Sequence, residues 1–249
     1  MSQFRLWLRR VLPLSLRQAV SQMRRRMRDA RNGVRLSAVH SDANLNAWVL
    51  QAELRQPIMA GVLFANKLAN LRHGAQCVNR AQIAPGETWS FWRYVNKPSA
   101  RNGFVPGRNL VNGQLVGQVG GGLCQLSSLI YHLGLLAGLN VVERHPHSID
   151  IYHEHERFTP LGADATVVWG AKDLRLMNPH DVEVILECVV QEHFLVGRAY
   201  ARSKLPDYDV SFVRKQLDAR HAIVDTLVNA RQHTQTSYRQ EQGMGLQRS

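Results

Sequence analysis

The chain has 249 residues, 45% of them hydrophobic, and a formal net charge of +12 at pH 7. This length and composition predict a globular protein with a real core, either one domain with appendages or two small domains. Its three cysteines, Cys77, Cys124 and Cys188, form no CxxC pair, which argues against a disulfide scaffold and against a cysteine-based zinc finger. The positive charge lies at the ends: residues 1–36 hold ten arginines against one aspartate, whereas basic and acidic residues balance over 37–199.

Residues 1–40 are interpreted as a basic, amphipathic N-terminal arm. Apolar and aromatic residues precede the cluster "RRRMR" at residues 24–28. The arm over Met1 to Leu36 suits an anionic membrane surface, nucleic acid is the less favoured polyanion, and a solvated basic extension stays open. Its apolar segment "VLPLSL" is short and contains Pro13, so neither a spanning helix nor a secretory signal is predicted. We therefore expect a cytoplasmic protein, peripheral at the inner membrane face.

The first half of the central domain predicts a mixture of helix, strand and loop. Apolar spacing over Ala47 to Leu71 is loosely helical, and "CVNRAQIAPGETWSFWRYV" predicts two strands around the turn "APGE". Residues 99–122 read as a long loop with seven glycines, of the kind that is functional or disordered. Cys124 to Ala137 is the clearest helix, with Gly138 as its C-terminal cap.

Downstream of this helix, four segments predict strands and one predicts a helix. The strands are "NVVER", "DATVVWG", "VEVILECVV" and "HFLVGRAY", the last two forming a hairpin. The segment "FVRKQLDARHAIVDTLVNARQ" has helical spacing, and the polar tail after it predicts disorder. We expect an α+β domain over 41–205, in which the Cys-bearing helix packs on a mainly antiparallel sheet, followed by a C-terminal helix and tail over 206–249.

Cys124 follows three consecutive glycines, Gly120, Gly121 and Gly122, at the predicted start of the helix. A thiol there lies in the positive end of the helix dipole, which favours the thiolate, and unpaired backbone amides nearby can hold an oxyanion. These features suit a cysteine nucleophile. Packing alone is the competing interpretation, because cysteine is among the most buried residue types.

A base and an orienting carboxylate follow in the sequence. His147 comes after one predicted strand and Asp164 comes before the next, so His147 is the candidate proton carrier and Asp164 the group that orients it. The order Cys124, His147, Asp164 is that of transglutaminase-like enzymes, and papain-like enzymes use Asn third, which suggests such a layout by analogy of order alone.

The histidines also allow a metal interpretation. A zinc site would draw on histidine nitrogens and acidic oxygens, here His145, His147, His153, His155, Glu154, Glu156 and Asp164. Pro146 disrupts regular strand pairing and the sequence has no HExxH spacing. We therefore predict no metal and no other cofactor.

Several segments together resemble the VanW family. They are "NRAQIAPGETWSFW", "GFVPGRNLVNG", "GGGLCQLSSLIYHLGLLAGLNVVERHPHS", "GADATV" and "LRLMNPHDVEVIL", and they cover about Asn66 to Leu186. The family pattern matches here at Gly120, Gly121, Gly122, Cys124, Gln125, Tyr131, His147, Ser148 and Asp164.

The resemblance implies an association with glycopeptide resistance and the cell envelope. With the residues above, it leads us to expect a cysteine-dependent hydrolase or acyl transferase acting on an amide or peptide bond, with a peptide-like or cell-wall-precursor ligand. Gln125 would assist the oxyanion or cap local backbone, and Arg108 or Asn112 would bind substrate. The alternative is a non-catalytic binding or scaffold module of the envelope in which Cys124 is structural.

Overall fold

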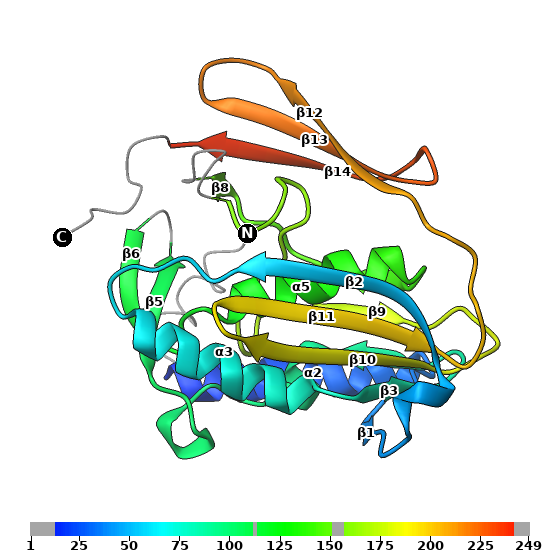
Figure 1. Ribbon diagram of the computed structural model, residues 1–249. Helices are drawn as coiled ribbons and strands as arrows, with labels where there is room; N and C mark the ends of the chain where they lie inside the picture. The colour runs from blue at the N-terminus through cyan, green and yellow to red at the C-terminus, as the bar shows by residue number, and fades with distance from the viewer. Residues whose placement is uncertain (1–12, 112–113, 151–156, 242–249) are drawn as a thin grey trace.

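The computed structural model describes residues 13–111, 114–150 and 157–241 of the chain. Its largest sheet has five strands in the order β1-β3-β10-β11-β2, and every neighbouring pair is antiparallel (Figure 1). The strands are β1 (Val39–His40), β2 (Val49–Pro57), β3 (Ala81–Ile83), β10 (Val184–Gln191) and β11 (Phe194–Ala201). The predicted hairpin is confirmed, because β10 and β11 pair from Val184↔Ala201 to Gln191↔Phe194.

Two helices, α3 (Phe64–Val78) and α5 (Leu123–Leu136), contact each other and pack against this sheet. Helix α5 approaches strand β11 closely at Gly197, where a Cβ atom would lie 3.0 Å from a Leu129 methyl group. After α5, Gly138 has φ +66° and ends the helix in a Schellman motif. In this motif the N–H groups of Gly138 and Leu139 donate to the carbonyls of Leu135 and Gly134. The helix thereby has a fixed position on the sheet, and so does its first turn.

Three smaller sheets and one short helix, α4 (Phe91–Val95), surround this core. The three-stranded sheet contains β4 (Thr88–Ser90), β9 (Arg175–Met177) and β7 (Asn140–Glu143). The four-stranded sheet contains β12 (Val210–Gln216), β13 (His221–Val228), β14 (Arg231–Gln240) and β8 (Ile149–Asp150), and β5 (Pro106–Val111) pairs with β6 (Gln114–Val119). The protein thus has the expected α+β class with mainly antiparallel sheets.

The prediction of a helix over Ala47 to Leu71 is wrong for its first part, which forms strand β2. Leu50 and Leu54 are four residues apart, a spacing that fits a helical face but also a regular strand, in which side chains alternate with a period of two; in β2 a β-bulge between these residues interrupts the alternation. Pairing with β11 along nearly the whole strand decides between the two. The helix α3 begins only at Phe64.

The predicted C-terminal helix is also wrong. Residues 210–240 form the antiparallel strands β12, β13 and β14, and β14 includes the first part, residues 233–240, of the tail that was expected to be disordered. Ile223 and Leu227 have the same ambiguous spacing of four, while Val224, Thr226 and Val228 are β-branched and favour a strand. The C-terminal segment is therefore a sheet that packs onto the domain (Figure 1).

Two further segments differ from the sequence prediction. Part of the glycine-rich loop forms the antiparallel strands β5 and β6, which pair from Pro106↔Val119 to Val111↔Gln114. The segment "DATVVWG" forms no strand; its single bridge joins Val168 to Lys172. Side chains and a neighbouring loop bind its backbone instead, as the site below shows.

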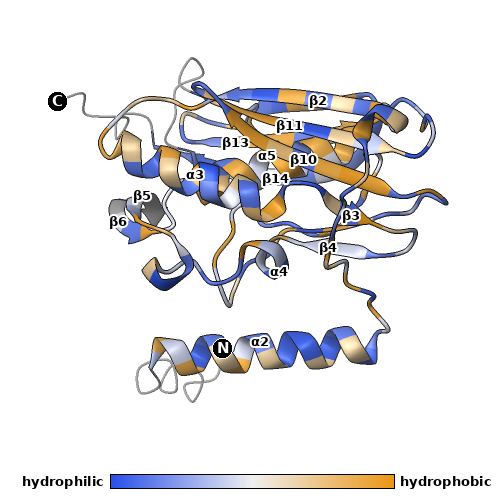
Figure 2. Cartoon of the chain, turned by 60° about the horizontal axis from the view of Figure 1, so that its bottom comes forward, coloured by the Kyte–Doolittle hydropathy of each residue, from blue (hydrophilic) through white to orange (hydrophobic). Residues whose placement is uncertain are grey.

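The N-terminal helix α2 (Leu14–Arg31) is attached to the domain through polar contacts. Asp29 is buried and its carboxylate pairs with Arg175 at 2.9 and 3.1 Å, and Arg25 pairs with Glu143. In Figure 2 the helix lies beside the rest of the chain, beyond α4. Within the part of the chain that the structure describes, no helix is long and apolar enough to cross a membrane.

Candidate active site

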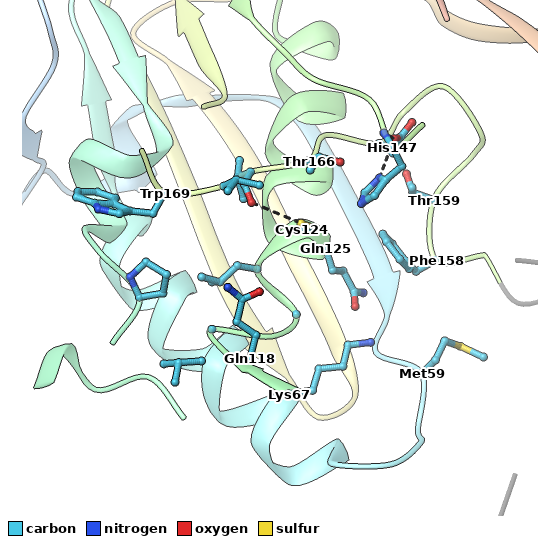
Figure 3. Close-up of a pocket in the computed structure, with 18 of the residues that line it drawn as sticks. Met59, Lys67, Gln118, Cys124, Gln125, His147, Phe158, Thr159, Thr166 and Trp169 are labelled. Carbon is cyan, nitrogen blue, oxygen red and sulfur yellow. Dashed lines mark hydrogen bonds and ion pairs between the residues drawn. The ribbon is translucent and has the colours of Figure 1, made fainter. Parts of the chain in front are cut away.

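A cavity of about 590 Å³ opens at the start of helix α5 (Figure 3). Its wall combines the start of α5 and the glycine turn with segments from α2, α3, the loop before β8 and the "DATVVW" segment. Cys124, His147 and Asp164, far apart in the sequence, all line it. The structure therefore brings the three predicted residues to one place.

The glycines before Cys124 take backbone conformations that other residues avoid. Gly120 and Gly122 have φ +85° and +101°, in the left-handed region that favours glycine. The carbonyl of Gly121 accepts a hydrogen bond from the side chain of Asn70 on α3 at 2.9 Å, which fixes the turn to a second helix. Asn70 is fully buried and was not predicted from the sequence.

This turn leaves backbone donors unpaired at the head of α5. The N–H groups of Leu123 and Gln125 donate to the carbonyls of Gly120 and Gly122, at 3.3 and 2.9 Å. Among the described residues, no acceptor is found for the N–H groups of Gly122 and Cys124. Unpaired amides at a helix start are suited to an oxyanion next to the thiol.

Replacing Gly122 by alanine is expected to lower the free energy of unfolding by about 1–2 kcal/mol, because an L-residue at this φ is strained. The new Cβ would also lie 3.1 Å from Cγ of Lys67. Urea denaturation measures the change. Gly117→Ala is the matched control, since that position is open and has no positive φ; an equal loss in both variants would contradict the explanation.

Asp164 is a buried carboxylate in which both oxygens have partners. Oδ2 accepts from the backbone N–H of His147 at 2.7 Å and lies 2.8 Å from its Nδ1, while Oδ1 accepts from Arg144 at 3.0 Å and from the Tyr238 hydroxyl at 2.5 Å. Burial raises the pKa of Asp164, but the hydrogen bond and charge of His147 and the charge of Arg144 outweigh it, so the pKa lies below its usual range. The carboxylate stays ionised and holds His147 through Nδ1, which leaves Nε2 to face the thiol.

Cys124 and His147 shift each other's ionisation. Burial raises the pKa of the Cys124 thiol, but the hydrogen bond and charge of His147 lower it, and the net pKa lies below the ordinary value. Burial lowers the pKa of His147, but its bonds to Asp164 and Cys124 raise it, and the net pKa lies well above the ordinary value. The two groups therefore stabilise each other's charged forms, thiolate and imidazolium. The thiol also lies 4.0 Å from the carbonyl of Val167.

Two serines of α5 hold the segment that carries Asp164. The Ser127 hydroxyl donates to the carbonyl of Ala165 at 2.6 Å, and the Ser128 hydroxyl accepts from the N–H of the same residue at 3.0 Å. The N–H of Thr166 donates to the carbonyl of His145 at 2.6 Å. These bonds replace the strand pairing that was predicted for "DATVVWG" and place Asp164 beside the histidine loop.

Arg144 and Tyr238 complete the site and were missed in the sequence. Arg144 donates to Asp164, to the carbonyl of Gly162 and to Thr236 on β14, and its guanidinium lies 5.0 Å from the centre of the Tyr131 ring. Arg144 stands in "ERHPHS", where only the histidines drew attention. Tyr238 lies in a segment predicted to be disordered, so no sequence signal could place it.

Changing Tyr238 to phenylalanine removes one donor from Asp164 and is expected to lower the free energy of unfolding by about 1.5–3 kcal/mol, the usual range for a hydrogen bond to a charged group. Thermal or urea unfolding checks this. Tyr200→Phe, on the five-stranded sheet away from this carboxylate, serves as the control. Equal stability of Tyr238→Phe and wild type would show that β14 does not support the site.

The remaining predicted binding residues have different outcomes. The Gln125 side chain donates to the carbonyl of Pro57 at 2.9 Å, so one of the donors expected for the oxyanion is already used. Arg108 lies in strand β5, but its side chain is not among those described, and Asn112 lies outside the described residues.

The zinc interpretation finds no support within the described residues, where no group of three or more His, Cys, Asp or Glu is arranged to hold a metal. His145 instead lies 3.0 Å from the Glu143 carboxylate. His153, Glu154, His155 and Glu156 fall outside the described residues.

Comparison with known proteins places this site within a family. The chain is 30% identical over 156 residues to the vancomycin B-type resistance protein VanW of Enterococcus faecalis and 32% identical over 117 residues to the uncharacterized protein YoaR of Bacillus subtilis. These matches cover 60% and 47% of this chain, but only 57% and 37% of the two relatives. No solved structure matches it. The family model described as VanW like protein matches residues 66–200, more than half of the chain, and the chain therefore belongs to the VanW family.

Proposed function

We propose that the protein is a cysteine-dependent hydrolase or acyl transferase that acts on an amide or peptide bond. The observation that carries this proposal is the connected set of Cys124, His147 and Asp164 in one cavity, with the pKa of the thiol lowered and that of the imidazole raised. A cysteine at a helix start with a histidine and a carboxylate on later segments is also the layout of papain-like and transglutaminase-like enzymes.

In the first step, the Cys124 thiolate attacks the carbonyl carbon and the electron pair of the C=O bond moves to oxygen. The N–H groups of Gly122 and Cys124 hold this oxyanion. The C–N bond then breaks, His147 gives its Nε2 proton to the leaving nitrogen, and a thioester remains on Cys124. Water or an acceptor amine attacks the thioester, His147 takes up the proton, and the thiolate is released.

The substrate class that the relatives favour is a peptide of the cell envelope, because one of them is named as a vancomycin resistance protein. The test incubates the purified chain with soluble cell-wall peptides and follows products and protein mass. We expect an acyl adduct on Cys124 and release of an amine-bearing fragment. Cys124→Ala abolishes both and Cys77→Ala, the matched thiol control, preserves both; turnover by Cys124→Ala would refute the proposal.

A non-catalytic binding module is the second candidate, favoured by the volume of the cavity and by contact of Cys124 with the buried core. In that case the thiol is a packing group and the cavity holds an envelope ligand without changing it. An unreactive Cys124 in a folded protein that still binds cell-wall peptides would establish this alternative.

We further propose that helix α2 lies on an anionic membrane surface at the cytoplasmic face. The residues that meet the domain are polar, Gln18, Arg25 and Asp29, whereas Leu16, Met23 and Met27 are exposed on the opposite side of the helix. Exposed arginines flank this apolar stripe, namely Arg24, Arg26, Arg28 and Arg31. Such a face suits anionic lipid.

Vesicle sedimentation tests the membrane proposal. Binding to vesicles that contain phosphatidylglycerol, without binding to pure phosphatidylcholine, is expected, and Met23→Glu with Met27→Glu should abolish it. Val213→Glu with Leu217→Glu, on exposed apolar positions elsewhere, is the control. If both double variants sediment with the phosphatidylglycerol vesicles to the same extent as wild type, α2 has no role in membrane binding.

A further inference from the structure

A partly buried lysine of the described cavity wall, Lys67, has no carboxylate partner. Lys67 comes from α3, and its stem lies against Gly122, where an added Cβ would be 3.1 Å from Cγ of the lysine. In the described part of the chain, no carboxylate pairs with its ammonium group. Burial lowers the pKa of Lys67 to about 8, so at neutral pH the group is mostly charged.

The acidic groups of the described cavity wall are already occupied. Asp164 is bound by His147, Arg144 and Tyr238, and Asp150 pairs with Arg157 at 2.9 Å. No acidic group of the described cavity wall is therefore left to pair with the ammonium of Lys67. A partly buried cation of this kind is stabilised by a bound anion.

The cavity wall also contains a buried acceptor without a donor. Gln125 is 2% exposed; its amide nitrogen is fixed by the carbonyl of Pro57, and its Oε1 has no hydrogen-bond partner among the described residues. In Figure 3 the side chains of Gln125 and Lys67 point toward one another beside Cys124. Buried polar atoms in native proteins are nearly always paired, so this oxygen is a candidate acceptor for an N–H group of a ligand.

We propose that the cavity binds a peptide with a free C-terminal carboxylate, which pairs with Lys67 while a peptide N–H of the same ligand donates to Gln125 Oε1. A single ammonium matches a monoanion, and the unpaired acceptor requires a donor, which a peptide supplies as an N–H close to its terminal carboxylate. The binding mode rests on the proposed function in one respect. The C-terminal carboxylate of a peptide lies on the leaving-group side of the attacked amide bond, so the fragment that is released first carries this carboxylate.

Ligand titration tests this binding mode without relying on catalysis. In the Cys124→Ala chain, which cannot form the thioester, NMR titration compares N-acetyl-alanyl-alanine with its C-terminal amide and with inorganic phosphate. We expect the free acid to bind about tenfold more tightly than the amide, as the loss of a charge-assisted bond predicts. The proposal is overturned if the acid and the amide bind with equal affinity or if neither binds. It is also overturned if inorganic phosphate binds as tightly as the acid.

Two lysine variants locate the effect. Lys67→Gln should remove the preference for the acid and Lys67→Arg should retain part of it, whereas Lys97→Gln, an exposed lysine in the same cavity wall, should keep the full preference. A preference unchanged in Lys67→Gln overturns the assignment. If the wild-type chain binds the acid selectively but its Cys124 is inert, the carboxylate site is supported and the proposed catalytic function is refuted. If Cys124 is reactive but the acid and the amide bind equally, the catalytic function is supported and the carboxylate site is refuted.

Discussion

Asp164→Asn is expected to lower the free energy of unfolding at pH 7 by about 3–5 kcal/mol, the usual cost of breaking a buried ion pair. The substitution preserves size but leaves the Arg144 guanidinium, which donates to this carboxylate, without its counter-ion. It also replaces the negative charge that stabilises the imidazolium of His147 by a neutral amide. Urea denaturation of both proteins measures the loss.

The pH dependence of this stabilisation has a definite sign. The pKa of Asp164 is lower in the folded protein than in the unfolded chain. The contribution of Asp164 to the free energy of unfolding is therefore present above the pKa of the unfolded chain, about 3.9, and is lost as the pH falls below it. The acid-induced loss of stability should be smaller in Asp164→Asn, which has no carboxylate to protonate at this position.

Asp173→Asn is the matched control for Asp164→Asn. Asp173 is also buried and hydrogen-bonded, to Ser90 and to the N–H of Trp92, but it does not contact His147. Only Asp164→Asn should lower the pKa of His147, because the Asp164 carboxylate stabilises the imidazolium. If Asp164→Asn unfolds at the same urea concentration as wild type, the carboxylate does not organise the site.

The second large effect is expected from His147→Ala, which should slow alkylation of Cys124 at pH 7 by roughly tenfold or more, because loss of the hydrogen bond and charge of His147 raises the pKa of the thiol and removes thiolate. Without the imidazolium only burial remains to act strongly on the thiol. Cys188 shows the direction: burial raises its pKa to about 12. Mass spectrometry of the alkylated cysteine gives the rate.

His145→Ala provides the comparison for this experiment. His145 stands two residues away in the same loop, but its ring contacts Glu143 instead of the thiol. In His145→Ala, the alkylation rate of Cys124 should stay within about twofold of wild type, since the ring of His145 does not face Cys124. Equal slowing by both variants would indicate a disturbed loop and not a specific pair.

The candidate site was more predictable than the fold around it. Cys124, His147 and Asp164 have side chains whose chemistry is visible in the sequence, and the glycines before Cys124 marked a turn at a helix start. Residues that support the site from outside, such as Asn70 and Tyr238, carry no such signal, because their role depends on contacts between distant segments.

The errors in the fold have a common physical origin. Apolar residues spaced by four, such as Leu50 and Leu54 or Ile223 and Leu227, fit both a helix and a strand, and sheet pairing settled both cases. In the "DATVVWG" segment the β-branched residues predicted a strand, but Ser127 and Ser128 bind its backbone in place of a neighbouring strand. Neither outcome depends on local sequence alone.

The central claim is that Cys124 is an activated thiol, and the pH dependence of its alkylation by iodoacetamide in the wild-type chain tests it most directly. The rate, assigned to Cys124 by mass spectrometry, should follow a thiol pKa below the ordinary value of about 8.5, because the hydrogen bond and the charge of His147 together outweigh burial. A pKa at or above that value in the folded protein, as burial alone would produce, would contradict the account.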